Sequence, residues 1–215
     1  MDNKLTSTTR SSAVSTIVQD ACRRLPQELQ HLKPRMVALL NSHSDLRSFM
    51  DANGPNIQEE CGKDEKRAVM SKISPTLLVI DKSYGEGSAM IWLCKQLADF
   101  NEYVGKREKM DDWQITNLAR FIATKCSQLK ASEIMLFLYQ YKTGSWGPLY
   151  GVVDPQEFMV VLREKFIPWR ARKVEEAENE QRRRERESWR ETALKPDEIK
   201  KLKERILQIN NGLTT

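Results

Sequence analysis

The chain has 215 residues, 40% of them hydrophobic and 30% charged, which predicts one good-sized core with a charged appendage. Its formal net charge of +5 permits contact with nucleic acid or another acidic partner without requiring it. The four cysteines form no CxxC pair and the longest apolar run is five residues, so the composition argues against a zinc site, a redox motif and a membrane span, and predicts a cytoplasmic protein.

The amino-terminal quarter predicts a tail followed by two helical segments. Residues 1–12 are polar and rich in Ser and Thr, so we expect them to be disordered. Pro26 then separates two amphipathic patterns, and Pro34 is expected to kink or split the second. The first pattern comprises Val14, Ile17, Val18, Ala21 and Leu25.

Two further segments lack a helical pattern. Residues 53–67 begin with Asn-Gly-Pro and end in a run of charges, which predicts a loop. The Leu-Leu-Val-Ile run at 77–80 is bounded by Pro75 and Gly85, which predicts a short strand or an extended connection.

Three helices are predicted in the middle of the chain. The first runs from about Ser88 to Tyr103 and turns Ile91, Trp92 and Leu97 inward. The second is capped by Asp111 or Asp112 and has an apolar stripe of Ile115, Leu118, Ala119 and Ile122. The third, residues 131–142, is the most apolar and is therefore expected to be the most central.

The connection after this helix concentrates glycines and large aromatic residues. Gly144 is expected to end the helix in the left-handed conformation, and Asp154 with Pro155 to start the next one. That helix carries Phe158, Val161, Leu162 and Phe166 on one face. Between them, Trp146 and Tyr150 belong either to a packed, extended or hairpin-like link or to a surface that meets a base or a partner protein.

The stretches "LARFI", "LKASEIMLFLYQYKTGSWGPLYGVVDPQEFMVVL" and "PWRAR" resemble an uncharacterised family of small proteins encoded by gut Bacteroidetes and their mobile elements. The matching positions are Lys142, Gly144, Trp146, Gly147, Tyr150, Gly151, Asp154 and Pro155. The wider layout is similar to phage replication proteins that load the replicative helicase, which implies a helicase as partner. Lys130 stands where the family favours a threonine cap. Pro148 stands where a basic residue is usual; if that residue contacts phosphate in relatives, the contact is lost here.

The carboxyl-terminal residues 169–215 predict a charged helical arm. Residues 163–205 hold fifteen Lys/Arg and eleven Asp/Glu, and Pro168 is expected to interrupt the core helix before the arm. Four residues of the arm form a basic stripe beside an aromatic ring, a pattern that suits single-stranded nucleic acid: Arg182, Arg186, Trp189 and Arg190. The alternative is a plain solvated helix, because acidic residues alternate with the basic ones.

The last helix is signalled by Pro196 at its start and Asn211-Gly212 at its end. Its apolar residues follow a spacing of three, four and three: Ile199, Leu202, Ile206 and Ile209. Such a narrow seam is expected to dock on the protein's own core, on a second copy or on a larger partner.

The sequence thus predicts a mainly α fold: a helical bundle over residues 13–168, a short extended or hairpin-like insert, and a long charged helical arm. Only His31 and His43 are present, without a motif around them, so we predict no metal, cofactor or catalytic site. The functional prediction is a non-enzymatic adaptor of a phage or mobile element, associated with replication, that contacts a partner protein and single-stranded DNA. Its binding residues would be Lys142, Trp146, Tyr150, Arg182, Arg186, Trp189 and Arg190. The alternative is a structural protein whose arm mediates assembly; the oligomeric state stays open.

Overall fold

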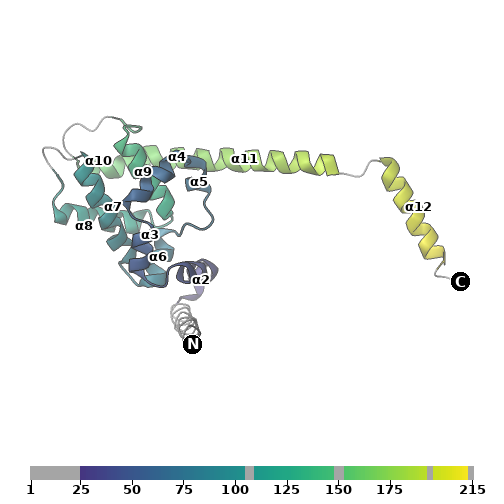
Figure 1. Cartoon of the computed structure of the whole chain (residues 1–215), viewed down its shortest axis with the longest axis horizontal. Helices are drawn as coiled ribbons and strands as arrows, with labels where there is room; N and C mark the ends of the chain where they lie inside the picture. Colours follow the sequence, from purple (N-terminus) through teal and green to yellow (C-terminus); the bar gives the residue numbers. More distant parts are fainter. Residues whose placement is uncertain (1–24, 105–108, 148–152, 193–195, 213–215) are drawn as a thin grey trace, which may run out of the picture. The chain divides into compact units, whose positions relative to one another are not determined.

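The structure is a computed structural model that describes residues 25–104, 109–147, 153–192 and 196–212 (Figure 1). The predicted tail, the first amphipathic pattern up to Ala21 and the predicted site residue Tyr150 lie outside the described residues. The described part of the chain is an all-α helical bundle with a long carboxyl-terminal helix and contains no β-strand. Its elements are η1 (Gln27–Leu32), α2 (Lys33–Ser42), α3 (Leu46–Ala52), η2 (Pro55–Ile57), α4 (Gln58–Lys63), α5 (Glu65–Met70), α6 (Leu77–Tyr84), α7 (Ser88–Val104), α8 (Asp112–Lys125), α9 (Ala131–Lys142), α10 (Pro155–Val160), η3 (Val161–Phe166), α11 (Ile167–Thr192) and α12 (Pro196–Gly212).

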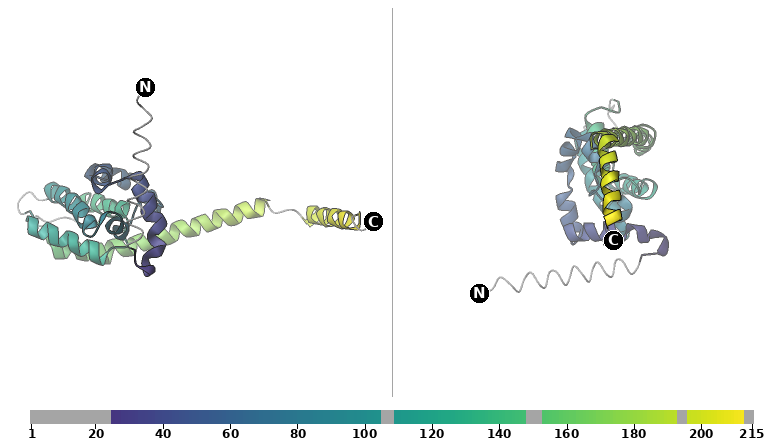
Figure 2. Two further views of the ribbon diagram at one scale, coloured as in Figure 1. Left: turned by 90° about the horizontal axis from the view of Figure 1, so that it is seen from below. Right: turned by 90° about the vertical axis from the view of Figure 1, so that its right-hand side faces the viewer.

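Helix α9 lies at the centre of the bundle, as its composition predicts. Ten of its twelve residues are buried, and α4, α5 and α7 all pack against it. Helix α8 lies beside α7, and α2 and α6 complete the bundle near its amino-terminal end (Figures 1 and 2). Because helices surround α9, no face of it is left to solvent, and it needs no amphipathic pattern.

The predicted helix starts and stops around α8, α9 and α10 are confirmed. The Asp111 carboxylate accepts a hydrogen bond from the Gln114 amide at 2.7 Å, and the Gln114 side chain accepts one from the Asp111 amide. Gly144 follows α9 with φ of +79°. At α10 the Asp154 carboxylate accepts from the Gln156 amide at 2.6 Å, with Pro155 in the first helical position. Local capping chemistry therefore sets these boundaries.

The Leu-Leu-Val-Ile run is helical, so the predicted strand is wrong. The Thr76 hydroxyl accepts a hydrogen bond from the Val79 amide and caps α6. Only the residues just before this helix are extended, where Pro75 and Leu77 pair through backbone hydrogen bonds with the segment that enters α9. The run is apolar on nearly every side because α6 packs against both α2 and α7, and burial on several faces hides the helical period.

The predicted loop over residues 53–67 is also wrong, because η2, α4 and the first half of α5 occupy it. Asp64 caps α5 through a 2.8 Å hydrogen bond from the Arg67 amide. Gly62 lies against α9 so closely that a Cβ atom there would come within 2.0 Å of the Tyr139 ring. The Asn-Gly-Pro start that suggests a loop is thus the beginning of η2, and the charges belong to two short helices.

Pro168 does not interrupt the chain's course, contrary to the prediction. A π-helical turn, η3, precedes it, in which the Ile167 amide donates to the Leu162 carbonyl five residues earlier. This wider turn accommodates a proline ring that would clash with the carbonyl four residues back in a regular α-helix. Helix α11 then runs on without a break to Thr192.

Ile91, predicted to face inward, is 48% exposed on α7, whereas its neighbour Trp92 is fully buried.

The chain divides into two compact units between Val174 and Glu175. The sequence places the start of the arm slightly earlier, at residue 169. Ile167, Trp169 and Val174 all pack against the buried core of the first unit, so the first turns of α11 are part of the bundle.

Candidate interaction surfaces

Lys142 is engaged by the first unit itself. Its ammonium forms an ion pair with the Asp99 carboxylate of α7, and it lies 5.4 Å from the centroid of the Tyr103 ring. Its side chain is only 14% exposed. Lys142 therefore joins the end of α9 to α7, and a ligand that used it would have to compete with Asp99.

Trp146 packs on the edge of the aromatic core. Its ring meets Phe166 and Trp169 edge to face, with centroids 6.0 and 5.8 Å away. Its carbonyl oxygen accepts a hydrogen bond from the Lys165 ammonium at 2.8 Å. The ring is half-buried, and its indole nitrogen is buried without a hydrogen-bond partner among the described residues. The packed alternative for the connection therefore describes Trp146 better than an open binding surface does.

A buried polar cluster anchors α9, and sequence reasoning missed it. Glu133 is fully buried; one carboxylate oxygen accepts from the Arg170 guanidinium at 2.8 Å and the other from the Lys130 amide at 2.9 Å. The Lys130 ammonium donates to the Val69 carbonyl at the end of α5 at 2.7 Å. Burial lowers the pKa of Lys130. Lys130 thus replaces the expected threonine cap with a longer link, and the arginine of the "PWRAR" stretch is the signal that points to this cluster.

Arg182 of the predicted basic stripe, and two arginines that lie outside the stripe, contact acidic side chains of their own helix. Arg182 contacts the Glu178 carboxylate at 4.0 Å and the Asn179 side chain at 3.0 Å. Arg183 pairs with Glu187 at 3.9 Å, and Arg184 pairs with Glu180. Residues 175–215 hold ten Lys/Arg and ten Asp/Glu. The second unit is therefore neutral, and the net charge of +5 belongs to the first unit.

The end of α11 presents the least compensated part of the stripe. Arg186 and Arg190 are exposed, and neither makes an ion pair within the described part of the chain. Trp189 lies between them and is 77% exposed. An exposed aromatic ring beside two guanidinium groups is the arrangement on which a nucleic-acid base can stack.

The apolar seam of α12 is exposed wherever its side chains are described. Ile199, Ile206 and Ile209 are 41, 49 and 56% exposed, while the side chain of Leu202 lies outside the described residues. Leu207, beside the seam, is 60% exposed. A soluble helix rarely keeps several large aliphatic residues in water unless another surface covers them.

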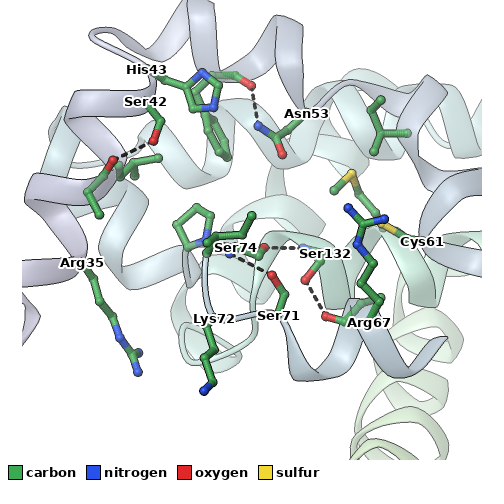
Figure 3. A pocket seen from close by; sticks show the side chains of 18 of the residues that line it. Arg35, Ser42, His43, Asn53, Cys61, Arg67, Ser71, Lys72, Ser74 and Ser132 are labelled. Carbon is green, nitrogen blue, oxygen red and sulfur yellow. Dashed lines mark hydrogen bonds between the residues drawn. The ribbon is translucent and has the colours of Figure 1, made fainter. Parts of the chain in front are cut away.

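Two further features of the first unit were not predicted from the sequence. One is a pocket enclosed by α2, α4, α5 and the segment before α6 (Figure 3). The other is the pair of exposed rings Trp113 and Phe121 on α8. The pocket has no signal because its walls come from segments far apart in the chain. The rings could be found by noting that both fall off the buried stripe of α8.

The fold defines the chain as an all-α protein, and one family model is similar to part of it. A family described as "Family of unknown function (DUF6633)" matches residues 109–204, from just before α8 into α12. This range covers somewhat less than half of the chain. No curated protein and no solved structure matches the chain.

Neither a metal-binding cluster nor a membrane-spanning helix occurs among the described residues. No three His, Cys, Asp or Glu side chains in the described ranges come together in a way that would hold a metal ion. None of the helices described combines the length and the apolar composition needed to cross a bilayer.

Proposed function

We propose that this protein is a non-enzymatic adaptor, encoded by a phage or mobile element, that binds a partner protein through the apolar seam of α12. The resemblance around the Trp146 connection supports the mobile-element origin. The similarity of the wider layout to helicase-loading phage proteins supports a role in replication, with the replicative helicase as the first partner to test. The family match over residues 109–204 includes that connection and most of the arm, so both features fall in the same matched range.

The exposure of Ile199, Ile206 and Ile209 on one helix carries the proposal. Their spacing places them on a single face, and the same helix carries its charged residues elsewhere on its circumference. Burial of such a side chain contributes about 1.5–3 kcal/mol, so three or four of them supply the affinity of a specific helix-in-groove contact. We therefore expect the seam to bind an apolar groove on the partner protein.

Affinity capture with the tagged full-length protein tests this proposal. The wild-type chain is used as bait in a lysate of the cell that encodes it, alongside a variant with Ile206→Glu and Ile209→Glu. Leu207→Glu is the matched control, because Leu207 is equally exposed but lies beside the seam. The adaptor proposal is supported if the wild type and the control capture a protein that the double variant does not. That protein, once purified, must also bind the purified wild-type chain.

Self-association is the alternative that the same variants separate. Light scattering on the purified chain over a range of concentrations reports its mass. A wild-type oligomer that the double variant reduces to a monomer, with no other protein captured, replaces the adaptor with a structural protein that assembles through its arm.

Single-stranded DNA is a second candidate ligand, favoured by the exposed Trp189 between Arg186 and Arg190. Gel-shift titrations at several salt concentrations measure it, since log K falls with log salt by about 0.7 per neutralised phosphate on single strands. Replacing Arg186 and Arg190 by Gln should flatten this slope. Arg183→Gln should change it less, because Arg183 already pairs with Glu187. Absence of binding at low salt removes this candidate.

A further inference from the structure

One feature of the first unit that the proposed function does not use is the pocket between its amino-terminal helices (Figure 3). Its volume is about 570 Å³, and its lining comes from α2, α3, α4, α5, the segment 71–75 and α9. A volume of roughly 300–1,000 Å³ is typical of sites for small organic ligands. The pocket lies outside the surfaces proposed above to bind protein or DNA.

The floor of the pocket is apolar and buried. Leu39, Phe49, Ala68 and Met135 line it and are each less than 7% exposed. The Phe49 ring packs against Trp92 and Tyr84 beneath the floor, with centroids 6.1 and 6.0 Å away. Such a surface favours an apolar ligand body, because no polar group of the ligand would find a partner there.

The wall beside the floor carries hydroxyl groups that keep a proton to donate. Ser71 accepts a hydrogen bond from the Ser74 amide at 3.1 Å, and Ser74 accepts one from the Ser132 amide at 2.9 Å. Neither hydroxyl donates a hydrogen bond within the described ranges. Ser132, in contrast, donates to the Ala68 carbonyl at 2.7 Å. Ser71 and Ser74 are thus two donors on one short segment.

Three cations from three segments line the same pocket: Arg35 of α2, Arg67 of α5 and Lys72. None of them makes an ion pair with a described carboxylate. Figure 3 shows Arg35 and Lys72 extending toward one side, opposite His43, and the Arg67 side chain running toward Cys61. Burial raises the pKa of the Cys61 thiol to about 11, and Arg67 opposes that shift only weakly.

Two carboxylates also line the pocket, and they do not cancel these cations. Asp64 is committed to the start of α5, where it accepts from the Arg67 amide. Glu60 remains on α4. The positive side chains therefore outnumber the negative ones, and the hydroxyl donors lie next to Lys72 in the chain.

We propose that this pocket binds a small amphiphilic anion, a molecule with an apolar body and one carboxylate, sulfonate or phosphate group. The body lies over Leu39, Phe49 and Met135. The charged group lies near Lys72, where Ser71 and Ser74 donate to it and the arginines add positive potential.

The test compares two fluorescent dyes on the full-length chain. 1-Anilinonaphthalene-8-sulfonate has an apolar body and an anionic group, and N-phenyl-1-naphthylamine has the same kind of body without the charge. We expect saturable binding of the anionic dye, at least tenfold tighter than that of the neutral dye. Lys72→Gln, Arg67→Gln and Ser71→Ala should each weaken the anionic dye about three- to tenfold and leave the neutral dye unchanged.

Two variants control for position and folding. Arg47→Gln removes an exposed arginine of α3 that does not line the pocket, so it should leave both dyes unchanged. Ala38→Trp fills the pocket from the exposed surface of α2 and should abolish binding of both dyes, with the helical circular-dichroism spectrum retained. Equal affinity for the two dyes, or equal losses from Lys72→Gln and Arg47→Gln, overturns the proposal.

Octanoate and an acidic amphipathic peptide distinguish the kinds of occupant. Octanoate should displace the anionic dye and raise the thermal midpoint, because a ligand of the native state stabilises it. Displacement by the peptide alone, with octanoate inert at millimolar concentration, overturns the small-molecule site and makes the pocket a protein-docking groove.

Discussion

Trp146 and Trp189 both lie at helix ends beside basic residues, yet the two units treat them in opposite ways. In the first unit Trp146 packs on Phe166 and Trp169, and its neighbour Lys142 is paired with Asp99. In the second unit Trp189 is 77% exposed. The same residue types thus close a core in one region and form a surface in the other. Local composition does not separate these outcomes, because burial depends on what the rest of the chain supplies.

The largest test of this contrast is Phe137→Ala. Phe137 is buried at the centre of the aromatic cluster, with ring centroids of Phe158 and Phe166 at 5.2 and 5.1 Å. We expect a loss of about 3–5 kcal/mol in the free energy of unfolding, from lost transfer energy and the cavity left behind. Urea unfolding followed by tryptophan fluorescence measures it. The matched change in the second unit, Trp189→Ala, should alter the free energy of unfolding by no more than about 0.5 kcal/mol. A loss as large as that of Phe137→Ala would contradict the difference in burial between the two units.

Glu133→Ala should have the next largest effect. It leaves Arg170 and Lys130 without the carboxylate that both approach, at a position with no solvent exposure. We expect a loss of about 2–4 kcal/mol in the same unfolding experiment, below the upper range for a buried pair because Arg170 keeps some access to water. Glu187→Ala, which removes the exposed partner of Arg183, is the control and should cost less than about 0.5 kcal/mol. Similar losses in the free energy of unfolding for both variants would contradict the burial of Glu133.

Gly144→Ala sharpens the comparison at the end of α9. The backbone there has φ of +79°, and a Cβ atom would meet no other atom within 4 Å. Only backbone strain remains, so we expect a loss of about 1 kcal/mol in the free energy of unfolding. Gly144→Asn should lose less, since asparagine tolerates this conformation better. Equal losses for the two replacements would point to a cause other than the dihedral angle.

The smallest expected effect is that of Arg184→Gln in the second unit. Its ion pair with Glu180 joins exposed positions i and i+4 of one helix, which contribute about 0.2–0.5 kcal/mol. We expect amide hydrogen exchange over residues 180–188 to quicken by no more than about twofold, with no change in the unfolding of the first unit. A larger change would mean that this ion pair stabilises structure beyond its own helix.

Much of the fold could be predicted because it is locally encoded. Asp111, Gly144 and Asp154 set helix boundaries through their own backbone and side-chain chemistry, and the structure confirms all three. The predictions that are wrong depend on neighbours far along the chain. The run at 77–80 shows no helical period because α2 and α7 both pack on it, and the short helix α4 in the predicted loop packs against α9, where Gly62 contacts Tyr139.

The candidate sites divide along the same line. The seam of α12 and the Arg186–Trp189–Arg190 surface can be found from spacing alone, because each lies on one helix. The engagement of Lys142 by Asp99, the Glu133 cluster and the pocket above Phe49 each join three or more residues from distant segments. No period or motif in one segment indicates such a meeting.

By itself the sequence determined that this chain is helical, where most of its central helices begin and end, and which face of α12 is apolar, since hydrogen bonds and side-chain periodicity within a few residues are sufficient for that. Only the tertiary structure decided which aromatic and basic residues are enclosed, that the net charge belongs to the first unit, and that a pocket with an apolar floor and a cationic rim exists. The physical reason is that burial and cavities are properties of the packing between segments. One segment cannot specify them, because half of each contact is supplied by another.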